Sequence, residues 1–275
     1  MRAHFRHSPG NRQPLVSRWI WLALLFFPLG LHAEPAPEDP AVRDLRAVHV
    51  MESAAELNGL TPDDQKKLAS LFDSLVLKYP QNGAIRNARG EFLWVIDEKT
   101  RAEADWRAAA ELDPKNADVL DHLGGCAVDA GEIKDGVRYF ERAIAATPER
   151  ALFHFHFANV LWLFRNDIAG EPAQNMERAL GQYAEAVRIE PLNEEFLRSY
   201  GETFYLLPKP DWQTALPVWE KYLQVTEHKD FALTNLARVH LRLGQKTEAL
   251  ACLAEIQAPE FRSLKARLEA QCRQN

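Results

Sequence analysis

Proline recurs along this chain at a fixed interval. Pro80, Pro114 and Pro148 are each 34 residues apart, and each follows a stretch typical of a helix end (LKYP, ELDP and AATP). Pro191 follows after 43 residues, which is one more interval with an insertion. A period of this length is typical of stacked helical hairpins. The sequence therefore predicts an array of helix pairs in which each pair packs mainly on its neighbours.

Each interval holds two amphipathic segments with small residues where the segments must cross. The clearest pair is predicted over Asn116–Ala130 and Lys134–Ala146, with Gly124 in the first helix and Ala143 in the second. A larger side chain at such a crossing would push the two helices apart. Gly131 suits the left-handed conformation that often ends a helix. The pattern therefore predicts closely packed antiparallel helices.

Five successive segments repeat the same small, aromatic and proline positions. They contain Arg89-Gly90, Ala102, Trp106, Ala109 and Pro114; Leu123-Gly124, Gly136, Phe140, Ala143 and Pro148; Phe157-Ala158, Ala179, Tyr183, Ala186 and Pro191; Tyr200-Gly201, Ala215, Trp219 and Tyr222; and Leu236-Ala237, Gly244, Ala249 and Leu253. This pattern, from 83 to 259, resembles the tetratricopeptide-repeat (TPR) family. The resemblance implies an all-α, right-handed α-solenoid of helix-turn-helix units whose concave face binds a partner.

The predicted domain organisation follows from these segments. Residues 34–79 form an N-terminal helical hairpin, a divergent repeat or cap in which Thr61 caps a helix that begins at Pro62. Residues 80–259 hold about five TPR units, with an insertion near 165–175. Residues 260–275 form an amphipathic capping helix, because the last repeat would otherwise leave an apolar face in water.

The first 33 residues predict an export signal. They carry four arginines and no acidic residue, followed by the short apolar run WIWLALLFFPLGL. This run has fewer than the roughly 20 residues that a membrane-spanning helix needs. Cleavage after Ala33 predicts a periplasmic or secreted protein without a membrane span. The alternative is an uncleaved N-terminal helix that anchors the protein.

Charge limits the kind of partner that the chain can bind, and the cysteine positions limit lipid attachment and disulfide formation. Removal of residues 1–33 leaves 29 basic and 39 acidic residues, so the mature chain repels nucleic acid and anionic lipid. Glu34 at the predicted cleavage site excludes a lipid-anchored lipoprotein, which needs a cysteine there. Cys252 and Cys272 fall at different heights on neighbouring antiparallel helices, so we predict no disulfide.

Two departures from the repeat pattern carry expectations of their own. Arg89 occupies a position where the pattern has an apolar residue, so we expect its helix to pack loosely. The aromatic run 153–164 cannot face one core across a helix, so we expect part of it to be exposed or covered by the insertion. The insertion itself is expected to lengthen both helices or to project as a loop.

The concave face supplies the candidate binding residues, because in the TPR family the first helix of each pair lines it. Projection of these helices predicts a partner-binding groove formed by Trp94, Asp121, Phe155, Asn159, Trp162, Arg198, Glu202, Tyr205, Arg238 and Arg242. The groove suits a peptide with an apolar anchor and charged ends. Each of these side chains could equally be an ordinary solvated or packed helix residue.

Nothing in the sequence supports catalysis, a cofactor or a metal. The chain has no glycine-rich phosphate loop, no HExxH motif and no nucleophile elbow. His154 and His156 point about 200° apart on a helix and cannot share a metal ion. Asp118, Asp121 and His122 share a helix face, but no fourth ligand is evident, so a solvated acidic face is favoured.

The sequence therefore predicts a non-catalytic interaction scaffold that holds a protein or peptide partner in its concave groove outside the cytoplasm. Two alternatives stay open. The first is a structural protein of the cell envelope that self-associates into a homo-oligomer through its exposed aromatic residues. The second is an accessory subunit of an exported enzyme, with the 165–175 insertion at its site.

Overall fold

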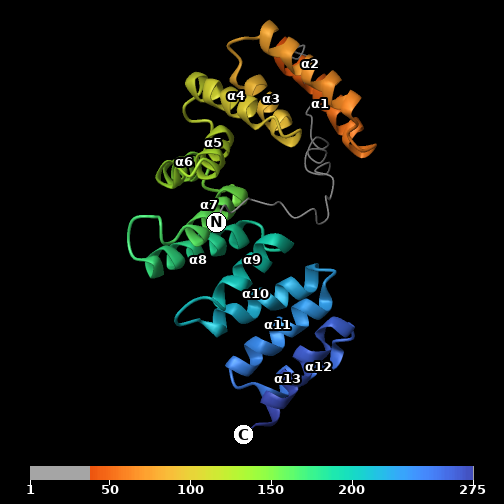
Figure 1. Ribbon diagram of the computed structural model, residues 1–275, viewed down its shortest axis with the longest axis vertical. Helices are drawn as coiled ribbons and strands as arrows, with labels where there is room; N and C mark the ends of the chain where they lie inside the picture. Colours follow the sequence, from red (N-terminus) through yellow and green to blue (C-terminus); the bar gives the residue numbers. More distant parts are fainter. Residues whose placement is uncertain (1–37, 275) are drawn as a thin grey trace, which may run out of the picture. The chain divides into compact units, whose positions relative to one another are not determined.

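The computed structural model describes residues 38–274, so the predicted signal peptide lies outside the described residues. All regular structure within this range is helical, and no strand occurs in it. Figure 1 shows the helices following one another as antiparallel pairs. None of the helices in the described range is long and apolar enough to cross a membrane.

The chain divides into two compact units, the first ending at Ala130 and the second beginning at Gly131. The described part of unit 1 holds α1 (Pro40–Leu57), α2 (Pro62–Lys78), α3 (Gly83–Val95), α4 (Lys99–Leu112) and α5 (Ala117–Asp129). Unit 2 holds α6 (Ile133–Ala146), α7 (Ala151–Leu163), α8 (Pro172–Ile189), α9 (Glu194–Phe204), α10 (Trp212–Val225), α11 (Lys229–Arg242), α12 (Lys246–Glu255), the 3₁₀ turn η1 (Pro259–Phe261) and α13 (Arg262–Arg273). The predicted all-α class of helix-turn-helix repeats is confirmed.

Most of the recurring prolines stand two residues before a helix cap. Asparagine follows three of them at the second position, and Asn82, Asn116 and Asn193 each cap the next helix. In every case the asparagine side-chain oxygen accepts a hydrogen bond from a main-chain N–H in the first turn of the helix. This bond satisfies a donor that the helix itself leaves unpaired. Each proline and asparagine pair thus ends one hairpin and begins the next.

The N-terminal hairpin is capped as predicted. The Thr61 side chain accepts a hydrogen bond from the Asp64 main-chain N–H, the Asp64 carboxylate accepts one from the Thr61 N–H, and α2 begins at Pro62. Phe72 of α2 is fully buried and stacks on Phe92 of α3, with ring centres 5.2 Å apart. The hairpin α1–α2 is thereby joined to the core of unit 1.

Two glycines allow close contact between paired helices. A Cβ atom on Gly90 would lie 2.6 Å from Nε1 of Trp106, and one on Gly201 would lie 2.6 Å from Cε2 of Trp219. Both tryptophans are buried, and each packs against the helix that carries the glycine. Only hydrogen in place of Cβ permits this packing.

The expectation of loose packing at Arg89 is wrong. Its guanidinium donates two hydrogen bonds of 2.6 Å to Asp105 of α4 and one of 2.9 Å to Asp73 of α2. Asp105 is only 3% exposed. Because the arginine is paired on both sides, it takes the place of an apolar contact and joins three helices of unit 1.

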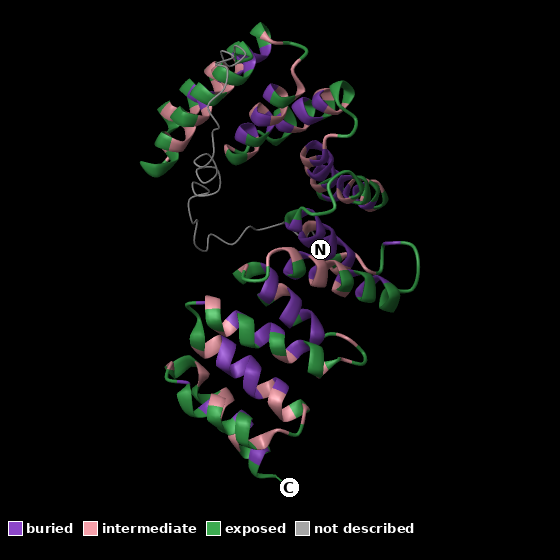
Figure 2. Ribbon diagram, turned by 180° about the vertical axis from the view of Figure 1, so that it is seen from behind, coloured by how far each residue is buried: buried purple, intermediate pink, exposed green. Residues whose placement is uncertain are grey.

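The expected partial exposure of the aromatic run is confirmed at its end, at Trp162, Leu163 and Phe164, but the three phenylalanines before them are buried. Phe153, Phe155 and Phe157 point in different directions from α7, yet all three are buried. Helix α7 packs against α6 and α8, and Phe155 also contacts Phe196 of α9, 4.6 Å away. A helix covered on several sides can be apolar all round. In Figure 2, most of α7 has the colour of buried residues.

The insertion forms a loop and lengthens the helix that follows it. The loop covers 164–171, and α8 then runs for 18 residues. Asn175 is 1% exposed, and its side-chain amide donates to the carbonyls of Arg165 and Ile168. These bonds hold the loop against the start of α8.

Helix α13 closes the C-terminal end of unit 2. Leu268 and Cys272 are buried against a cluster from α11 and α12 that includes Leu233 and Leu253.

Cys126, Cys252 and Cys272 are free thiols, as predicted for Cys252 and Cys272. Burial raises the pKa of the Cys126 thiol to about 12, which keeps it protonated and unreactive.

Candidate partner-binding surface

Five of the predicted residues come together in unit 2. We call this surface the arginine face, and it consists of Arg198, Glu202 and Tyr205 of α9 and its C-cap together with Arg238 and Arg242 of α11. The spacing of four residues places Arg198 with Glu202, and Arg238 with Arg242, on one side of each helix. The two helices are joined at Tyr205, whose hydroxyl donates to the Asn235 carbonyl across 3.1 Å.

Tyr205 is the centre of the arginine face. The Arg238 guanidinium lies 4.0 Å from the centre of its ring, and the Trp212 ring centre lies 5.3 Å away. Burial raises the pKa of Tyr205, and the nearby Arg238 and Arg242 partly oppose that shift, so the hydroxyl stays protonated as a donor. Planar cationic and aromatic groups stacked in this way present a flat, rigid surface.

Trp212 was not among the predicted residues. It begins α10, and Arg242 lies 5.9 Å from its ring centre. The signal was present in the sequence, because Asp211 was recognisable as a helix cap and does accept hydrogen bonds from the first turn of α10. The first residue after a cap lies close to the end of the preceding helix in a short hairpin.

Within the described residues, none of the three arginines of this face forms a salt bridge. Within residues 38–274, neither Arg198 nor Arg242 has a carboxylate at salt-bridge distance, and Arg238 bonds only to the Asn235 side-chain amide, at 3.2 Å. The single acid of the face is Glu202, whose pKa is raised by burial and lowered to a smaller extent by Arg198. The arginine face is therefore cationic.

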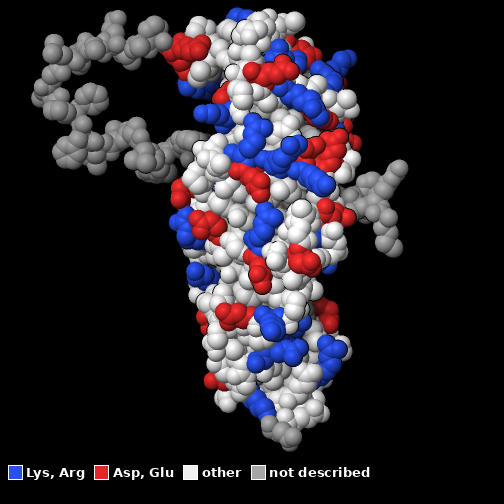
Figure 3. All heavy atoms as spheres, turned by 90° about the vertical axis from the view of Figure 1, so that its left-hand side faces the viewer, with Lys and Arg blue, Asp and Glu red and all other residues white. Residues whose placement is uncertain are grey.

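Some other arginines of unit 2 are paired with acids. Arg188 bonds to Glu149 and Glu185 at 2.9 Å each, and Arg178 bonds to Glu141 at 3.0 Å. On the face shown in Figure 3, basic side chains lie among acidic ones. Within residues 38–274, the arginines on α9 and α11 differ from Arg178 and Arg188 in having no salt bridge.

Two of the predicted residues of α7, Asn159 and Trp162, make contacts of their own. Asn159 accepts a hydrogen bond from the Tyr183 hydroxyl, and the pKa of Tyr183 is raised by burial and by Glu202. Trp162 is partly exposed, with the Arg165 guanidinium 4.6 Å from its ring centre. Arg165 also donates to the Trp162 carbonyl at 2.9 Å. Arg165 is thus a second residue that sequence reasoning missed.

Phe155 does not form part of the surface. It is 5% exposed and packs between Tyr183 and Phe196, with ring centres 5.9 and 4.6 Å away. The prediction that it lines the groove is wrong, because α7 is covered on the side that carries it.

Trp94 and Asp121, the remaining predicted residues, belong to unit 1. Trp94 is partly exposed, with the Lys99 ammonium 4.8 Å from its ring centre. Asp121 is 4% exposed, so it offers little surface to a partner. Beside Trp94, Glu91 and His122 form a 3.1 Å contact. Burial alone would raise the pKa of Glu91, but the His122 contact leaves it lowered. The predicted set is thus divided between two compact units.

The described residues do not support a metal site. Among residues 38–274, no group of three or more histidine, cysteine or acidic side chains is placed to hold a metal ion. His122 is instead stacked on Trp106, with ring centres 4.4 Å apart.

Comparison with known proteins places the fold among TPR structures. No protein-family model matches the sequence. The human mitochondrial import receptor subunit TOM70 is 26% identical over 139 residues, which are 50% of this chain and 22% of TOM70. This chain therefore spans about a fifth of the length of that relative.

Solved structures agree over a larger part of the chain. YrrB, described as a TPR protein with an unusual peptide-binding site, superposes with a TM-score of 0.58 at 19% identity, over 72% of this chain and 98% of YrrB. Pseudomonas aeruginosa pilF superposes with a TM-score of 0.62 at 13% identity, over 83% of this chain and 100% of pilF. PilW, a type IV pilus biogenesis factor, superposes with a TM-score of 0.55 at 15% identity, over 81% of this chain and 97% of PilW. The chain therefore has the fold of TPR proteins.

Proposed function

We propose that this protein is a non-catalytic scaffold that binds a protein or peptide partner on its arginine face. The observation that carries the proposal is the stacking of Arg238 on Tyr205, on a surface whose three arginines form no salt bridge within residues 38–274. Arginine, tyrosine and tryptophan are the residues that contribute most to protein interfaces. Their charge favours a partner segment that carries acidic side chains.

Rigidity of the surface supports the same proposal. Asn235, which is 3% exposed, accepts a hydrogen bond from Arg238 through its side chain and one from Tyr205 through its main-chain carbonyl. Side chains that are already ordered lose little conformational entropy when a partner binds. The similar structure of YrrB, whose description names a peptide-binding site, is consistent with a peptide ligand.

We further propose that the partner is met outside the cytoplasm. This part rests on the arginine-bearing, apolar N-terminal sequence that ends near Ala33. Mass spectrometry of the N-terminus from fractionated source cells tests it. Recovery of a chain that begins at Glu34 outside the cytoplasm supports export, whereas a chain that begins before Trp19 in the membrane fraction supports an uncleaved anchor.

Crosslinked capture of partners tests the binding proposal. The tagged full-length chain is compared with the double variant Arg238→Glu/Arg242→Glu. The matched control is Arg262→Glu/Arg267→Glu, which makes the same charge change at exposed residues of α13. We expect the α11 variant to lose a partner that the wild type and the α13 control both retain. Equal capture by all three proteins would contradict the assignment of the arginine face, and capture of the chain's own copies would favour self-association.

A further inference from the structure

A second site lies on the opposite side of α9 from the arginine face. A cavity of about 420 Å³ opens between α8, α9 and α10, all within unit 2. Its volume falls within the range of roughly 300–1,000 Å³ found for ligand-binding pockets. Tyr200 of α9 lines the cavity, and it is two residues away from both Arg198 and Glu202. Two residues correspond to about 200° around a helix, so the two sites are separate.

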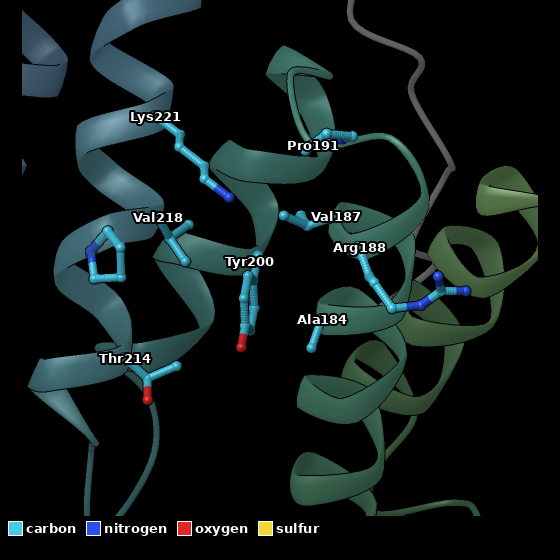
Figure 4. A pocket seen from close by; sticks show the side chains of 9 residues that line it. Ala184, Val187, Arg188, Pro191, Tyr200, Thr214, Val218 and Lys221 are labelled. Carbon is cyan, nitrogen blue, oxygen red and sulfur yellow. The ribbon is translucent and has the colours of Figure 1, made fainter.

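The walls of the cavity are mostly apolar. They are formed by Ala184, Val187, Pro191, Pro217 and Val218. Figure 4 shows Val187 and Val218 facing the same space from α8 and α10. An apolar side chain placed there would lose contact with water at little cost to the protein, because the pocket is already formed.

Tyr200 adds a hydrogen-bond donor that the protein does not use. The residue is only 7% exposed, and Figure 4 shows its side chain reaching into the cavity. No hydrogen bond joins its hydroxyl to any residue between 38 and 274. Burial, and to a smaller extent Asp211, raise the pKa of Tyr200, so the hydroxyl keeps its proton. The hydroxyl oxygen itself is reached by solvent, so a ligand acceptor would replace a water molecule at this donor.

Lys221 adds a positive charge at the edge. Its amine is directed toward the space between α10 and α8 in Figure 4, and within the described part of the chain it has no carboxylate at salt-bridge distance. Arg188 differs, because its guanidinium points away and is held by Glu149 and Glu185. Arg188 therefore lines the cavity only with its aliphatic stem. Thr214 is also occupied, because its hydroxyl donates to Asp211 at 2.7 Å.

We propose that this cavity docks an extended partner segment that pairs an apolar side chain with an acidic one. The apolar side chain lies between Val187 and Val218, the acidic side chain pairs with Lys221, and a main-chain carbonyl accepts from Tyr200. A peptide supplies all three groups within two or three residues. This inference rests on the proposed function as a partner-binding protein and adds a second contact surface to it.

Binding of blocked dipeptides to the full-length chain tests this site directly. The probes are acetyl-Leu-Glu-amide and acetyl-Glu-Leu-amide, so that both chain directions are covered. The controls are the corresponding Leu-Gln and Gln-Leu peptides, which lack the charge, and acetyl-Gly-Glu-amide, which lacks the apolar side chain. Valine methyl NMR signals of Val187 and Val218 report occupancy, and those of the buried Val239 in α11 serve as the internal reference.

We expect at least one acidic probe to shift the Val187 and Val218 signals at millimolar concentration and to bind about fivefold more tightly than its glutamine analogue. Lys221→Gln should remove that preference, and Tyr200→Phe should weaken all apolar probes. Arg267→Gln, an exposed charge change on α13, should alter neither. The absence of shifts with both acidic probes, or an unchanged preference in Lys221→Gln, would overturn the proposal. Neither result would affect the arginine face, which these probes do not address.

Discussion

The Arg238 guanidinium and the Tyr205 ring lie 4.0 Å apart, and both residues are held by Asn235. Arg238 is therefore fixed flat against an aromatic ring instead of extending freely into solvent. This contact joins α9 to α11 and determines the direction in which the cation is presented.

Replacement of Arg238 by lysine should weaken the contact between α9 and α11 without changing the charge. Lysine cannot stack as a plane on Tyr205 or keep the same bond to Asn235. We expect Arg238→Lys to lower the free energy of unfolding by about 0.5–1 kcal/mol, measured by urea denaturation. The control is Arg262→Lys at an exposed position of α13. If the two variants prove equally stable, the stacking contributes nothing.

Alanine at the two crowded glycines should destabilise the fold. The added Cβ would lie 2.6 Å from the indole of Trp106 in Gly90→Ala, or of Trp219 in Gly201→Ala. We expect a loss of about 1–3 kcal/mol for each. Gly125 in α5 and Gly181 in α8 have no atom within 4 Å of an added Cβ, so alanine there should stabilise the helix by up to about 1 kcal/mol. Thermal unfolding compares these pairs, and a similar response at all four glycines would refute the packing argument.

Much of the fold was predictable from the sequence, because its determinants are local and repeated. The prolines, the Thr61 and Asp211 caps and the small residues at helix crossings each act within one hairpin. The burial of Phe155 was not predictable in the same way, because it depends on Phe196 of the next hairpin. The same holds for Arg89, whose partners Asp73 and Asp105 come from two other helices. The sequence was thus enough to predict which helices carry the binding surface, but not whether each predicted side chain is exposed.

Removal of one member of the buried ion pair should be more harmful than removal of both. Asp105→Ala leaves the Arg89 guanidinium with only the half-exposed Asp73, so we expect a loss of about 3 kcal/mol. The double variant Arg89→Met/Asp105→Leu removes both charges of the pair. It leaves Arg86, which lies 3.7 Å from Asp105, with its bond to the Pro80 carbonyl, so it should regain most of that stability. Chemical denaturation of the two variants decides the point. A double variant less stable than Asp105→Ala would show that the pair itself stabilises unit 1.

Unit 1 should show a pH-dependent contribution from His49. Its pKa is raised above 6.5, chiefly by the 3.0 Å contact with Glu52, although burial acts in the opposite direction. A raised pKa in the folded state means that protonation stabilises the fold. That contribution is fully present below pH 6.5 and is lost as the pH rises through the folded-state pKa.

The variant His49→Gln isolates this effect. Its deficit in unfolding free energy relative to wild type should be largest near pH 5.5 and should shrink by pH 8.5, roughly one to two pH units either side of the transition. Urea denaturation at both pH values measures the difference. A deficit that is independent of pH would mean that His49 acts only through packing against Phe72.

Hydrogen–deuterium exchange of the complex with a captured partner tests the central claim most directly. Exchange is compared for free and bound full-length chain by mass spectrometry of peptides from α9 and α11. The account predicts slower exchange in 194–205 and 229–242, the segments that carry the arginine face. Protection confined to other helices, with these two segments unchanged, would contradict it.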